Sequence, residues 1–165
     1  MAVNPTFGEP QKGDVVNVIP PQKAGTIAEV AGLTDDNGWC PVDQRSFESR
    51  QQKHIHVIGD ASIANPMPKS GFAASSQGKV CATAIVASLS GQEMPDPSYV
   101  NTCYSLVGPD YGISVAAVYR FGDDGIAAVE GAGGVSPKDA SAEFRVAESR
   151  YALGWYQSIT SDIWG

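Results

Sequence analysis

The chain of 165 residues has few basic side chains and no long hydrophobic run. Its 11 lysines and arginines stand against 18 aspartates and glutamates, which gives a net charge of −7. This balance argues against nucleic-acid binding, because such a surface needs positive charge to displace counterions from phosphates. The most apolar stretch, residues 80–89, falls short of the ~20 residues that cross a bilayer, so we expect no membrane span.

Leader signals and metal-binding patterns are also lacking. Residues 1–10 have no basic stretch followed by an apolar one, so we expect no secretory signal in this chain. Cys40, Cys81 and Cys103 make an odd number, so at least one lacks an intrachain disulfide partner. No two of them stand at metal-ligand spacing, and there are only 2 histidines, so we expect no metal site.

The first 95 residues alternate short apolar runs with turn-forming residues. Proline and glycine mark residues 1–13 as a loose arm. The patterns predict a helix within residues 23–33 and short strands at residues 15–19, 46–50 and 54–58. Ser70 follows two prolines and is a suitable N-cap for a helix of small residues that extends to about Leu89, before Gly91.

The remaining residues predict a more regular structure. Strands are expected at residues 99–107, 113–121 and 126–130, joined by glycine- and aspartate-containing turns typical of an antiparallel meander. A flexible loop over residues 131–138 then leads to a helix over residues 140–163, with a packing stripe at Ala147, Tyr151, Trp155 and Ile159. The fold class is therefore α+β: a strand, a Gly-Asp turn and a long helix, then a three-stranded antiparallel meander and a C-terminal helix.

The chemistry of interest lies at the Gly-Asp turn. Gly59 lets the backbone turn sharply, and Asp60 presents a carboxylate that can accept hydrogen bonds from sugar or ribityl hydroxyls. The helix that begins near Ser70 offers free amides and a positive dipole end, which favour negative charge on a planar ring. A reduced flavin needs both features. Taken alone, these residues fit an ordinary turn better, because Gly-Asp pairs are common in turns.

The turn and its surroundings resemble a known family. Gly59, Asp60 and Ala61 are similar to the second FAD motif of glutathione-reductase-like flavoproteins. The runs GWCPVD at 38–43 and HVIGDA at 56–61 resemble the flavoprotein subunit of flavocytochrome c sulfide dehydrogenase. The same resemblance extends over residues 15–20, 23–25, 32–36, 47–49, 66–71, 76–79, 101–105 and 111–120.

The resemblance implies an incomplete FAD-binding domain over residues 1–95 and a C-terminal flavocytochrome c sulfide dehydrogenase domain over residues 96–165. In that family the flavoprotein oxidises sulfide at FAD and passes electrons to a cytochrome c subunit in the periplasm. Asp60 would hold the ribityl chain. Cys40 would be one of two cysteines in a redox-active disulfide, which hydrosulfide attacks to give a persulfide. The flavin ring would lie beside Pro68, Lys69, Ser70 and Gly71.

Half of such a site is missing. No G-x-G-x-x-G follows a strand, so the motif that places the FAD pyrophosphate on a helix N-terminus is absent. The family's second redox cysteine lies upstream, and this sequence has no obvious substitute. We therefore expect that the chain alone binds FAD weakly or not at all and is inactive. We expect it to need the N-terminal FAD/NAD-like portion of the flavoprotein as a partner. Without that portion, we expect it to self-associate or exchange strands through the surfaces left uncovered, which are the edge of the strand that contains Val57 and the small-residue face of the helix after it.

Two other functions fit the sequence. The chain could be a non-enzymatic subunit-docking module, or part of a related flavin disulfide reductase or sulfide:quinone oxidoreductase. The last of these would carry a basic amphipathic C-terminal segment. The C-terminal helix here has Glu143, Glu148 and Asp162 beside Arg145 and Arg150, which makes it a poor membrane anchor.

Overall fold

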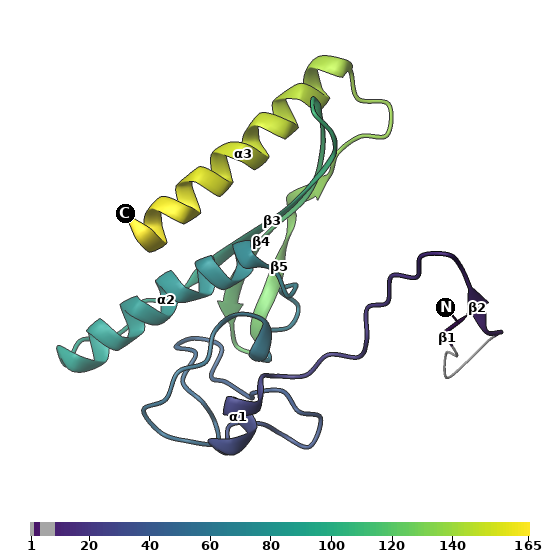
Figure 1. Ribbon diagram of the computed structural model, residues 1–165. Coiled ribbons are helices and arrows are strands. Elements are labelled where there is room, and N and C mark those ends of the chain that lie inside the picture. The colour runs from purple at the N-terminus through teal and green to yellow at the C-terminus, as the bar shows by residue number, and fades with distance from the viewer. Residues whose placement is uncertain (1, 4–8) are drawn as a thin grey trace.

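The computed structural model describes residues 2–3 and 9–165. Figure 1 shows an N-terminal arm that extends away from the rest of the chain. Two-residue strands β1 (Ala2–Val3) and β2 (Gln11–Lys12) pair in the arm. Of the loose arm predicted over residues 1–13, residues 1 and 4–8 lie outside the described part. The predicted strand at residues 15–19 is wrong. Val15 and Ile19 are 91% and 86% exposed, and β-branched side chains alone form no strand when no neighbouring backbone pairs with them.

Residues 24–70 fold mainly as loops. Helix α1 (Thr26–Val30) is shorter than predicted, and the 3₁₀ helix η1 (Gly59–Ala61) forms the Gly-Asp turn. The strands expected at residues 46–50 and 54–58 are wrong, since only isolated bridges join Val42 to Ser49 and Glu48 to His56. Left-handed backbone at Phe47 and His54, with φ of 62° and 63°, interrupts both runs.

Helix α2 (Gly71–Leu89) confirms the predicted long helix and its N-cap, because the Ser70 side chain accepts a hydrogen bond from the Ala73 amide. The small residues of α2 let it pack closely against β3 and the Gly59–Ala61 turn of the same chain. Its buried side chains are Ala73, Gln77, Cys81, Ala84 and Ala87. This small-residue face, which we expected a missing partner to cover, is therefore covered within the chain.

The antiparallel meander is confirmed, with longer strands than predicted. Strands β3 (Ser98–Gly108), β4 (Tyr111–Gly122) and β5 (Gly125–Val135) lie in the order β3-β4-β5. The loop expected from residue 131 begins only after Val135. Glycine has a low strand propensity, so the sequence predicted a loop at the end of β5. In the structure Gly133 and Gly134 nevertheless pair with Ala117 and Ala116.

Helix α3 (Ala142–Trp164) runs along the meander and begins after the N-cap Ser141. Its buried face differs from the predicted stripe, because Tyr151 is 62% exposed whereas Ala152 is buried. Close contact with β4 requires a glycine at position 112, where a Cβ atom would lie 2.5 Å from the Ser149 nitrogen. None of the helices in the described residues has the length and hydropathy to cross a membrane.

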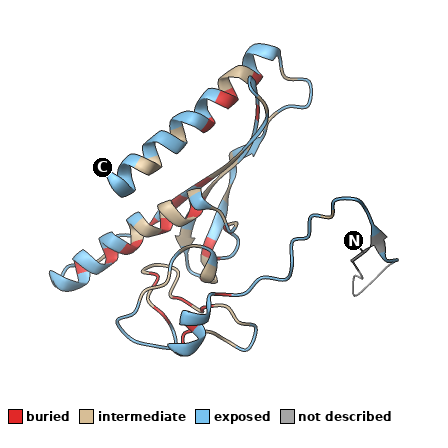
Figure 2. Cartoon of the chain, viewed as in Figure 1, coloured by how far each residue is buried: buried red, intermediate tan, exposed pale blue. Residues whose placement is uncertain are grey.

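One hydrophobic cluster joins the loop half to the meander. Phe47 is fully buried, and its ring meets that of Tyr99 edge-on, with centroids 5.9 Å apart. Figure 2 shows buried positions along α2 and in the loops beneath it, while the arm is exposed. The cluster contains Val42, Phe47, Ala64, Met67, Ala73, Cys81, Tyr99, Tyr119 and Ile126.

Candidate flavin-binding site

The Gly-Asp turn is held in place by helix α2. The Gly59 amide donates to Oε1 of the buried Gln77 at 2.7 Å, and the Ser62 hydroxyl donates to the Gly59 carbonyl at 2.8 Å. Gly59 has a φ of 70°, and a Cβ atom there would lie 3.2 Å from Cβ of Ala74. Only glycine satisfies both the left-handed backbone and the close approach.

The N-terminus of α2 is the second part of the site. The Ser70 hydroxyl accepts from the Ala73 amide at 3.1 Å and donates to Oδ1 of buried Asn101 at 2.5 Å. The first α-helical hydrogen bond runs from Ala74 to the Ser70 carbonyl. Within the described residues, the amides of Gly71 and Phe72 therefore remain without an acceptor, as expected at a helix start. Such amides and the helix dipole attract an anionic group.

The structure brings these two parts together. The Lys69 ammonium donates to the carbonyl of Asp60 and, at 3.1 Å, to that of Ser62, so the residue just before Ser70 touches the turn. The Asp60 side chain is exposed, while Ala61 and Pro68 are half-buried. The turn that carries the exposed Asp60 carboxylate thus lies next to the segment that leads into α2.

The backbone of Cys40 is hydrogen-bonded to the Gly-Asp turn and to the residues just after it. The Cys40 amide donates to the Ala61 carbonyl, and the Ile63 amide donates to the Cys40 carbonyl, both at 2.9 Å. The side chain is 0% exposed. Burial raises the pKa of the thiol, the Asp35 carboxylate raises it further, and the Lys69 ammonium opposes the change. The thiol is therefore a poor nucleophile in this arrangement, because the thiolate is the reactive form.

Trp39 precedes Cys40 and packs under Lys69. The Lys69 Nζ atom lies 3.8 Å from the centroid of the indole ring, which is cation–π geometry. The Trp39 amide donates to Oδ1 of Asp35 at 3.1 Å. The indole also packs against the small hydrophobic cluster of Ala24, Ala28, Leu33 and Cys40. Trp39 therefore contacts both this cluster and the Lys69 ammonium.

In the described part of the chain, no side-chain hydrogen bond or ion pair joins the remaining cysteines or the histidines directly to the Gly59–Ala61 turn or to Ser70, although Asn101, which binds Ser70, also donates to the Cys103 sulfur at 3.3 Å. Cys81 is buried in α2, Cys103 is half-buried in β3, and all three cysteines are free. His54 is exposed, and Nδ1 of His56 lies 3.1 Å from the Ser46 carbonyl oxygen.

Sequence reasoning assigned no role to three residues that build the site. They are Gln77 under Gly59, Ser62 beside it, and Asn101, which binds Ser70 from β3. Spacing offers a signal only for Gln77, because a residue seven positions after Ser70 returns to the same helix face. The other two contacts depend on the tertiary fold.

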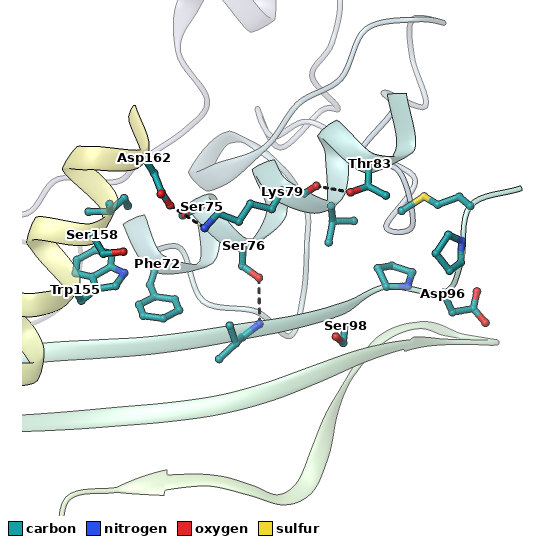
Figure 3. A pocket seen from close by; sticks show the side chains of 16 residues that line it. Phe72, Ser75, Ser76, Lys79, Thr83, Asp96, Ser98, Trp155, Ser158 and Asp162 are labelled. Atoms are coloured by element: carbon teal, nitrogen blue, oxygen red, sulfur yellow. Dashed lines mark hydrogen bonds and ion pairs between the residues drawn. The ribbon is translucent and has the colours of Figure 1, made fainter. Parts of the chain in front are cut away.

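A separate groove opens between α2, α3 and the start of β3, with a volume of about 540 Å³ (Figure 3). At one end Phe72 stacks on Trp155, with ring centroids 5.3 Å apart. Lys79 and Asp162 form an ion pair across it at 2.8 Å. None of the predicted flavin-site residues lines this groove.

Comparison with family models gives a match to the flavin-binding domain of flavocytochrome c sulphide dehydrogenase, over residues 95–164. Residues 95–164 belong to this family. The match covers the whole meander and α3, and it confirms the resemblance found in the sequence. These residues thus carry a domain of a flavoprotein family. The Gly-Asp turn, the α2 N-terminus and Cys40 precede the residues matched to the flavocytochrome c sulphide dehydrogenase domain.

Proposed function

We propose that this chain is the C-terminal part of an FAD-dependent sulfide dehydrogenase and supplies the ring-side wall of its flavin pocket. In this proposal residues 1–95 complete an FAD-binding domain and residues 96–165 form the C-terminal domain. The observation that carries it is that the Gly59–Ala61 turn, which bears Asp60, is held against the first turns of α2 by Gln77 and is bound by Lys69, two residues before that helix begins. The family match over residues 95–164 supports the same conclusion from a different part of the chain.

Each residue of the site has a distinct task in this proposal. The Asp60 carboxylate accepts hydrogen bonds from ribityl hydroxyls. The amides of Gly71 and Phe72, at the positive end of α2, stabilise negative charge on the pyrimidine side of the ring. FAD, when bound, supplies a two-electron acceptor. Gln77 keeps the Gly59 backbone in the one conformation that presents Asp60.

Cys40 provides the sulfur chemistry in the complete enzyme. Hydrosulfide attack on a disulfide that contains Cys40 forms a new S–S bond and releases the other cysteine as a thiolate. The partner cysteine comes from outside this chain, whose own three cysteines are free. Since Cys40 is 0% exposed and its pKa is raised mainly by burial, the isolated chain does not present a reactive thiolate.

The isolated chain should hold FAD poorly, because the contacts to the ADP half account for much of cofactor affinity. Purification with excess FAD, followed by an absorbance spectrum, tests this. We expect far less than stoichiometric flavin and no sulfide-dependent reduction of cytochrome c. A stoichiometric yellow protein would contradict the proposed half-site.

Docking of a cytochrome c subunit is a second role that the meander can serve in the periplasm. Ile113, Val115 and Val135 are 37%, 50% and 70% exposed, and Val115 pairs with Val135 across β4 and β5. Together they give the sheet an apolar patch, which suits the contact area of a protein partner. The net charge of −7 of the whole chain attracts a basic partner at long range, while Lys138 and Arg145 lie at the patch itself. Val115→Lys should weaken capture of a basic cytochrome c in a binding titration, and unchanged affinity would remove this role. Self-association through the same apolar patch would be seen as a dimer by sedimentation.

A further inference from the structure

Lys69 has more partners than a solvated surface lysine. Its ammonium donates to the Asp60 and Ser62 carbonyls and lies over the Trp39 ring at 3.8 Å. An ammonium has three N–H donors and no acceptor. Two donors serve the carbonyls and the remaining side faces the indole, so the ammonium has a partner within the chain on each of these sides even though the residue is exposed.

The partners of Lys69 lie close to Cys40, one as its neighbour in the chain and one across a backbone bridge. Trp39 precedes Cys40, and the Cys40 backbone bridges to Ser62, one residue beyond the Gly59–Ala61 turn. Lys69 therefore connects the segment that carries the thiol to the turn that carries Asp60.

We propose that Lys69 is a positioning residue, a latch that holds Trp39 and Cys40 against the Gly59–Ala61 turn and limits access to the Cys40 sulfur. The latch itself does not depend on FAD. Its consequence for sulfide chemistry rests on the proposed function, in which the Cys40 segment must move before hydrosulfide reaches the sulfur. Lys69 then acts through Trp39 and the turn and does not contact the flavin as its main role.

Lys69 also affects Cys40 through its positive charge. Loss of this charge and loss of the latch should change the reaction rate of the Cys40 thiol in opposite directions. The charged groups that act on Cys40 are Asp35 and Lys69, and those that act on Lys69 are Asp60 and Cys40. Removing the ammonium takes away a positive charge that lowers the pKa of Cys40, so the thiolate fraction and the reaction rate would fall. Releasing a latch would instead raise the rate, because the buried sulfur becomes accessible.

Alkylation of the full chain by iodoacetamide, followed by mass spectrometry of each cysteine peptide, separates these effects. We expect Lys69→Met to speed labelling of Cys40 by about tenfold. Lys69→Arg should restore a rate near that of the unchanged protein, because a guanidinium also donates hydrogen bonds and stacks on an indole. Lys79→Met, which removes an exposed ion pair from α2, serves as the matched control and should change nothing at Cys40.

Trp39→Leu provides an independent variant, since it opens the latch and leaves the Lys69 charge in place. It should also speed labelling of Cys40. Cys81, buried in α2, reports general loosening of the fold and should keep its rate in every variant. Slower or unchanged labelling of Cys40 in Lys69→Met, or an equal acceleration at Cys81, would overturn the latch. None of these measurements needs flavin or sulfide, so failure of the latch is distinct from failure of the proposed function.

Discussion

Residues 98–164 are almost entirely strand and helix, whereas residues 24–70 contain only a five-residue helix and a three-residue 3₁₀ turn. The first region satisfies its backbone through ladders between neighbouring strands and within one helix. The second relies on isolated backbone hydrogen bonds, such as that from the Cys40 amide to the Ala61 carbonyl, and on single side chains. One of these is Asp43, whose Oδ1 accepts from the amides of Arg45 and Ser46 at 2.9 and 3.0 Å. The candidate flavin site therefore stands on individually placed contacts, and the regular region provides its support.

The largest effect is expected where the regular region packs most closely. Gly112→Ala would place a Cβ atom 2.5 Å from the Ser149 nitrogen and 2.6 Å from the Glu148 carbonyl carbon, both backbone atoms of α3. We expect the free energy of unfolding to fall by about 3 kcal/mol in urea titration. Gly122→Ala, on the same strand with no atom within 4 Å, is the control. Equal stability of the two variants would show that the backbone of α3 does not lie in close contact with β4 at Gly112.

A somewhat smaller effect should follow from removing one anchor of the loop region. Gln77→Leu leaves the half-buried Gly59 amide without its acceptor, at a cost of about 2 kcal/mol. Gln157→Leu, at an exposed position of α3, should be near neutral. If the two substitutions cost the same, the Gly-Asp turn is not held by Gln77.

Matched helix caps sharpen the comparison further. Ser70 and Ser141 both cap helices, at 3.1 and 3.3 Å, but only Ser70 also binds Asn101. Replacing either by alanine should cost about 1 kcal/mol for the cap. Ser70→Ala should cost more than Ser141→Ala, because Oδ1 of the buried Asn101 also loses its donor. A larger loss at Ser141, measured by thermal or urea unfolding, would contradict this order.

The regular region was largely predictable from the sequence. Periodicity and turn residues gave α2, the meander and α3, because each is stabilised by local patterns. The strand predictions at residues 15–19, 46–50 and 54–58 failed, because strand propensity needs a partner backbone that these runs do not meet. Asp60 and Ser70 were recognisable from local chemistry, whereas Asn101 and the contact of Lys69 with Trp39 depend on residues far apart in the chain.

Alkaline pH gives the smallest effect and links the two regions. Burial, and to a lesser degree the Asp43 carboxylate, raises the pKa of Tyr99 well above its ordinary 10.0, and its hydroxyl donates to the Gln44 carbonyl at 2.6 Å. A group with a raised folded-state pKa stabilises fully below its unfolded value, and this contribution is lost as pH rises above it. Stability should therefore fall above about pH 10, less steeply in Tyr99→Phe. The same slope in both proteins, followed by circular dichroism, would exclude Tyr99 as a cause.

The central claim is that the Gly-Asp turn and the start of α2 together form the ring-side wall of a flavin site. The most direct test is titration of the ¹⁵N-labelled chain with FAD, followed by two-dimensional NMR. We expect fast-exchange shifts centred on the amides of Gly59, Asp60, Gly71 and Phe72, reduced in Asp60→Ala. Shifts at the groove residues Lys79, Thr83 and Asp162 without shifts at Gly59, Asp60 and Gly71, or no shifts at millimolar FAD, would contradict the account.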